Sequence, residues 1–122
     1  MRIFMQDVIG KATTLGEAIA KHERTKAFMA ADKAVHTNDQ AKAVMEAFHA
    51  QAAHIHQLET SQQPIEPADK QKLAAVQAEM AGNDLIKNFV RCQADYAELM
   101  NNVNQAIDQA VGQAGQTGET AE

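Results

Sequence analysis

The chain has 122 residues, a net charge of −5 and 45% hydrophobic residues, with one tyrosine, four phenylalanines and no tryptophan. Alanine, methionine and small aliphatic residues must do most of the packing, which favours closely spaced helices over β-sheets, because strands favour β-branched and aromatic residues. No basic run appears, and acids exceed bases by ten to four in residues 59–122, so we expect no direct binding of nucleic acid. No apolar run is long enough to span a membrane, and the single cysteine suits a reducing compartment. We therefore expect a cytoplasmic protein.

The spacing of apolar residues predicts helices over residues 6–21 and 23–35. Thr37 and Gln40 have the spacing of a capping box, so a third helix should begin there and run to about residue 61. Two prolines mark a loop over residues 62–67. A fourth helix is predicted over 68–81 and a fifth over 83–111.

These elements predict an all-α fold, an antiparallel helical bundle of about five helices, two of them long. Residues 1–111 should form a single helical domain. The tail of residues 112–122 is acidic and rich in glycine, with no apolar residue larger than alanine, so we expect it to be disordered.

The fifth predicted helix carries a coiled-coil-type apolar seam whose members alternate by four and three residues. They are Leu85, Phe89, Cys92, Tyr96, Leu99, Val103, Ala106 and Ala110. The helix should span about 43 Å, whereas the first, second and fourth helices reach roughly 20 Å each. A second copy of the chain could cover such a seam, so we expect a homodimer with an interface at Leu85, Phe89, Tyr96, Leu99 and Val103, and with Phe48 and Ile55 as the facing core. Short helices laid end to end along the seam in a monomer are the alternative.

A histidine-rich stretch runs from Met45 to Glu59 and raises the question of a metal site. At about 100° per residue, His49 and His56 fall on one flank of the apolar stripe and His54 falls on the other, so the three do not converge. Glu46 and His49 form one E-x-x-H pair, the unit of carboxylate-bridged di-iron bundles, but such bundles need two pairs. Only a dimer could supply the second pair, and we expect histidines that border the core and meet solvent.

Other chemical motifs give no active site. Ser61 is the only serine and lies next to the predicted loop, and the glycines never form a phosphate-binding loop. Cys92 lies on the apolar seam, where a buried and inert thiol is expected, because a reactive thiolate needs a polar, electropositive setting. We therefore expect no enzymatic activity and no cofactor.

The order of these features resembles the YlbF/YmcA family of small helical bacterial regulators. The first helix carries the Leu-Gly pair Leu15-Gly16, and an alanine-rich second helix follows. Met45 and Phe48 form the apolar-x-x-Phe step typical of the long third helix in this family. Residues 83–89 carry an N-x-L-I-x-x-F segment, and the resemblance covers roughly residues 5–111.

The resemblance implies a non-catalytic, all-helical cytoplasmic regulator that self-associates or joins related regulatory proteins. Such proteins influence competence, sporulation, biofilm formation and RNA processing through protein contacts. Some members work in a complex that carries iron–sulfur clusters, with cysteines toward their C-terminus, but the tail here has none. Two alternatives stay open. One is a metal-binding bundle that uses Glu46 and His49 across a dimer, and the other is a structural or chaperone-like helical hairpin.

Overall fold

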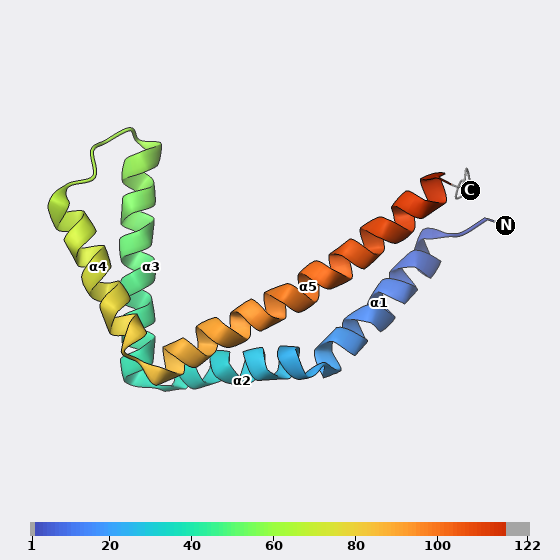
Figure 1. Cartoon of the computed structure of the whole chain (residues 1–122), viewed down its shortest axis with the longest axis horizontal. Helices are drawn as coiled ribbons and strands as arrows, with labels where there is room; N and C mark the ends of the chain where they lie inside the picture. Colours follow the sequence, from blue (N-terminus) through green and yellow to red (C-terminus); the bar gives the residue numbers. More distant parts are fainter. Residues whose placement is uncertain (1, 117–122) are drawn as a thin grey trace. The chain divides into compact units, whose positions relative to one another are not determined.

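A computed structural model describes residues 2–116, and this part of the chain contains five α-helices and no strand. Figure 1 labels the helices in chain order. They are α1 (Met5–Lys21), α2 (Glu23–Thr37), α3 (Asp39–Thr60), α4 (Pro67–Ala81) and α5 (Asp84–Gln116). The predicted all-α class, with five helices of which α3 and α5 are the long ones, is confirmed.

The helices are divided between two units. One unit holds residues 2–29 and 92–116, and the other holds Ala30–Arg91. Both α2 and α5 contribute to each unit, α2 by its two halves and α5 by its first turns and its remaining length. The single domain over residues 1–111 stays a prediction.

Local capping explains where the helices start. The Asn38 side chain accepts a hydrogen bond from the Ala41 backbone nitrogen at 2.9 Å and caps α3, because the first backbone N–H groups of a helix have no partner within it. Asn83 caps α5 in the same way, through the Ile86 nitrogen at 3.1 Å. Pro67 occupies the start of α4, where its missing N–H costs nothing.

The unit of residues 30–91 contains a helical hairpin, and Figure 1 shows α3 and α4 joined by the loop of residues 61–66. The loop turns at Gln62, whose φ of 58° lies in the left-handed region. The core of this unit consists of side chains from the end of α2, from α3 and from the start of α5. The buried members are Val35, Ala41, Val44 and Ile86, and Met45, Met80, Leu85 and Phe89 pack around them.

The unit of residues 2–29 and 92–116 holds α1, the first half of α2 and most of α5. Thr25 and Cys92 are its buried side chains among the described residues. Phe28 stacks on Tyr96 with ring centroids 5.1 Å apart and an interplanar angle of 16°. This contact holds α2 against α5.

Two predicted boundaries need correction. The third helix is capped by Asn38, not by Thr37, whose hydroxyl instead donates to the Lys33 carbonyl oxygen at 2.8 Å as part of the last turn of α2. Helix α5 continues to Gln116, five residues beyond the predicted end at Val111. Alanine and glutamine are good helix formers and offset two glycines that cost about 1 kcal/mol each. The predicted disorder of the tail falls, for residues 117–122, outside the described residues.

Candidate interaction surface

The predicted interface residues of α5 lie in different surroundings along the helix. Leu85 and Phe89 are half-buried and pack against the core of the Ala30–Arg91 unit. Tyr96 is half-buried and occupied by its stack on Phe28. Leu99 and Val103 are half-buried. The first part of the seam is thus in contact with other side chains of the same chain. The role of these five residues in an interface stays a prediction.

Apolar side chains on the seam of α5 and next to it are more exposed toward the C-terminal end of the helix. Ile86 is 1% exposed and Cys92 5%, whereas Ile107 is 46% and Val111 69% exposed. These side chains lie on one helix, so their exposed fractions differ because other side chains cover the start of α5 and not its end. The distal part of α5 therefore presents apolar side chains to its surroundings.

Helix α1 presents a second uncovered apolar face. It contains no buried residue, and Val8 and Ile9 are each 57% exposed. Met5 is 79% exposed and the preceding Phe4, which caps the helix, 61%. Because α1 is amphipathic, its open apolar side is a surface on which another element can pack.

An arginine ties the start of α2 to α5 near this region. The Arg24 guanidinium donates to the Asp95 carbonyl oxygen at 3.1 Å and lies 3.7 Å from the Glu98 carboxylate. Exposed ion pairs of this kind contribute little stability, at most about 1 kcal/mol. The same two helices also meet through the stack of Phe28 on Tyr96.

The histidines of α3 serve separate local contacts. His49 and Glu46 are both exposed, and the His49 ring meets Phe48 edge-on with centroids 5.7 Å apart. Within residues 2–116 there is no group of three or more His, Cys, Asp or Glu side chains that could hold a metal. A site shared between two copies through Glu46 and His49 stays a prediction.

His54 instead helps to join α3 to α4. Its Nε2 lies 3.1 Å from the Asp69 carboxylate, whose other oxygen accepts from the Glu66 backbone nitrogen at 3.2 Å. The buried Gln51 side chain donates to the Asp69 carbonyl oxygen at 2.9 Å. Asp69 therefore caps α4 and fastens its first turn to α3 at the same time.

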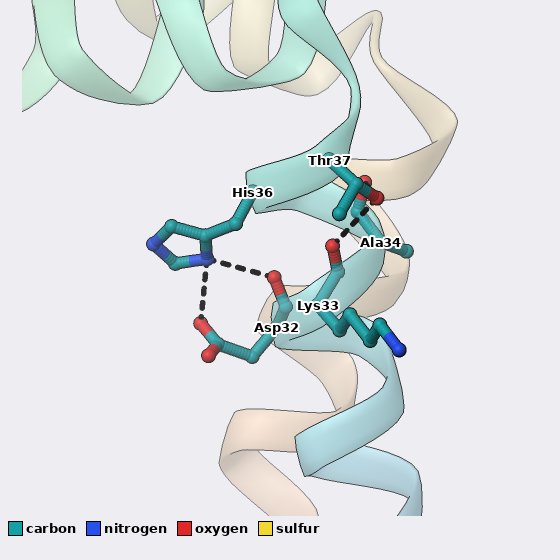
Figure 2. A network of polar contacts seen from close by, with 5 residues as sticks. All are labelled: Asp32, Lys33, Ala34, His36 and Thr37. Carbon is teal, nitrogen blue, oxygen red and sulfur yellow. Dashed lines mark hydrogen bonds and ion pairs between the residues drawn. The ribbon is translucent and has the colours of Figure 1, made fainter.

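A second histidine makes a local contact in the last turns of α2. Figure 2 shows His36 Nδ1 at 2.8 Å from the Asp32 carbonyl oxygen and 3.2 Å from its carboxylate. The Thr37 hydroxyl, beside it, donates to the Lys33 carbonyl oxygen and approaches that of Ala34 at 3.4 Å. These contacts all lie within the last turns of α2, so the network is local to one helix and forms no site with another element.

A shallow groove of about 250 Å³ runs between α3 and α4. Phe48, Ile55 and Leu73 line it, with His56 and Glu59 also at its wall. The predicted core residues Phe48 and Ile55 are thus half-buried and border this groove. Because apolar side chains form most of its wall, the groove suits contact with apolar side chains.

Comparison with known proteins places the chain among bacterial regulators. The family model described as "Control of competence regulator ComK, YlbF/YmcA" matches residues 8–112. The UPF0342 protein DSY1594 of Desulfitobacterium hafniense (strain Y51) is 21% identical over 105 residues, which cover 86% of this chain and 80% of that protein. One chain of a crystal structure of Bacillus subtilis RicA in complex with RicF is similar in fold, with a TM-score of 0.73 and 17% identity, over 90% of this chain and 97% of the matched chain.

Sequence reasoning missed the openness of the α1 face, although it did predict that the long seam of the fifth helix needs a cover. The apolar spacing over residues 6–21 predicts a helix, and the structure has that helix with Val8 and Leu15 both exposed. Periodicity reports which residues share a face, but it does not report whether another element covers that face.

None of the helices described over residues 2–116 is long and apolar enough to cross a membrane.

Proposed function

The chain belongs to the YlbF/YmcA family of regulators, and we propose from this membership that it is a non-catalytic regulatory adaptor. It acts in the cytoplasm by presenting helix faces to other proteins, and it forms a dimer with a second copy of itself. Competence, sporulation, biofilm formation or RNA processing is the kind of process that it controls. It binds neither nucleic acid nor a cofactor.

One observation carries this proposal, namely the uncovered apolar side chains on α1 and at the distal end of α5. Their exposed fractions run from 37% at Leu15 to 79% at Met5. Complete burial of a side chain of this size contributes about 1.5–3 kcal/mol, so covering this set would supply on the order of 10 kcal/mol. Association costs roughly 4–15 kcal/mol before any net affinity appears. Burial of the open faces thus supplies a free energy comparable to the cost of association, and can contribute much of what binding needs.

The solved structure of RicA supports a role in protein contacts, because it contains RicA in complex with RicF. By analogy, we propose that this chain also binds other regulatory proteins of its host. Because apolar side chains of α5 are open up to Val111, the same helix can serve both self-association and partner binding.

The experiment compares Leu99→Glu with Asn101→Glu in purified, untagged protein. Leu99 is half-buried on the apolar side of α5, and Asn101 is exposed on its other side. Light scattering after size exclusion should give a dimer for the wild type and for Asn101→Glu, and a monomer or unfolded chain for Leu99→Glu. A folded, intact Leu99→Glu dimer contradicts the predicted seam interface. A wild type that is monomeric and binds no co-expressed member of the family contradicts the adaptor role.

A further inference from the structure

We infer that the apolar face of α1 in one copy packs against the distal apolar face of α5 in a second copy, and that the contact is reciprocal about a two-fold axis. This inference rests on the proposed function, because it names the surface and the occupant through which the adaptor assembles. The α1 face comprises Met5, Val8, Ile9, Ala12 and Leu15, and the α5 face comprises Val103, Ile107, Ala110 and Val111. Both faces lie in the unit of residues 2–29 and 92–116, at the blue and red ends of the chain in Figure 1.

The α1 face is one continuous stripe. With about 100° between successive residues, Leu15, Val8 and Ile9 span an arc of roughly 120°. Polar and charged residues occupy the rest of the helix surface, and Thr14 lies opposite the arc. An amphipathic helix of this kind normally buries its apolar arc, yet α1 has no buried residue.

The α5 face shares Val103 and Ala110 with the seam and adds Ile107 and Val111, which lie next to it. Val103 is half-buried, whereas Ile107 and Val111, one and two turns further on, are 46% and 69% exposed. On the same projection these three side chains lie within roughly 80° of one another. A single partner helix can therefore cover them together.

The size of the two faces fits an ordinary dimer. The exposed fractions of the large apolar side chains of the two faces correspond to roughly 300 Å² of apolar side chain, taking about 60–120 Å² for each fully exposed side chain. A standard interface buries about 800 Å² on each partner, of which somewhat more than half is apolar. The apolar area of the two faces is thus of the size that contact with one further copy of the chain would bury.

The charges of the two segments favour packing of α1 against α5 over packing of α5 against α5. Residues 92–116 contain Asp95, Glu98 and Asp108 and no lysine or arginine. The segment of residues 2–21 contains three bases and two acids. Packing α5 against α5 brings acidic segments together, whereas packing α1 against α5 joins segments of opposite net charge. A two-fold interface must be complementary to itself, and a surface with one segment of each sign satisfies this.

The test uses complementation between two variants of the full chain, Val8→Lys and Ile107→Glu, measured by sedimentation equilibrium at several concentrations. Each variant alone places an unpaired charge in both halves of the reciprocal contact, so its dimer dissociation constant should rise at least tenfold. A mixed dimer has one native half, and its other half pairs the introduced lysine with the introduced glutamate. An equimolar mixture should therefore regain dimer. Thr14→Lys and Gln105→Glu, on the polar sides of the two helices, are the matched controls and should dimerise like the wild type.

Circular dichroism of each variant establishes that it is folded, which is expected because the replaced side chains are exposed. Single variants that stay dimeric, or a mixture that stays monomeric, overturn the inference. If only Leu99→Glu dissociates the dimer, the adaptor proposal stands and the α1–α5 contact is wrong. If the wild type is monomeric but binds another family member through α1, the occupant is a different protein and the inference fails while the adaptor role remains.

Discussion

Replacement of Ile86 by alanine tests the core that joins the start of α5 to the helical hairpin. Ile86 is 1% exposed and contacts the cluster that contains Val35 and Val44. The change removes three carbons, worth about 0.8 kcal/mol each on transfer from water. Because the site is closed, a cavity term of about 1 kcal/mol adds to this, so we expect a loss of about 3–4 kcal/mol in the free energy of unfolding.

Urea unfolding followed by circular dichroism at 222 nm measures this loss at fixed protein concentration. With a slope of about 1–3 kcal/mol per molar, the midpoint should fall by more than about 1 M. Val90→Ala is the control, because Val90 lies one turn further along α5 and is 48% exposed, and its cost should stay within about 0.5 kcal/mol. If Ile86→Ala costs no more than Val90→Ala, the assignment of the buried face of α5 is wrong.

Three further predictions concern local features. Asn38→Ala should destabilise the protein by about 1 kcal/mol through loss of the α3 cap, and Thr37→Ala by much less, in the same urea assay; equal losses would contradict the assigned cap. Asp69→Ala should cost about 1–3 kcal/mol, because the α4 cap and the His54 contact are lost, whereas Asp84→Ala, whose side chain is 97% exposed, should cost under about 0.5 kcal/mol. Gly10→Ala meets no atom within 4 Å and should slow amide exchange in α1 about threefold to fivefold; unchanged or faster exchange would show that α1 is not a helix there.

Much of the helix arrangement could be predicted from the sequence, because apolar periodicity and helix-breaking residues are local signals. The two prolines near residue 65 and Gly82 placed the ends of α4 to within one residue. The cap of α3 was one residue off, since Thr37 and Asn38 are both able to cap a helix. Backbone geometry decides between them: Asn38 is extended, with φ of −104° and ψ of 119°, and Thr37 is still helical.

The coverage of each apolar face could not be predicted in this way. Val8 and Ile86 both lie in regular apolar patterns, yet one is 57% and the other 1% exposed. The difference depends on contacts between segments distant in the sequence, which periodicity does not report. The role of the histidines is a similar case, because the projection separated His54 from His49 but could not identify Asp69 as the partner of His54.

Amide hydrogen exchange of α1, followed by mass spectrometry over a range of protein concentrations, tests most directly whether another chain covers the open helix faces. A helix of 17 residues with two glycines and no buried side chain is marginal by itself in water, so its amides should exchange rapidly in a lone chain. We expect their protection to increase as concentration rises through the dimer dissociation constant, and the same to hold for the distal turns of α5. Rapid exchange in α1 at every concentration, with or without a family partner present, would contradict the account.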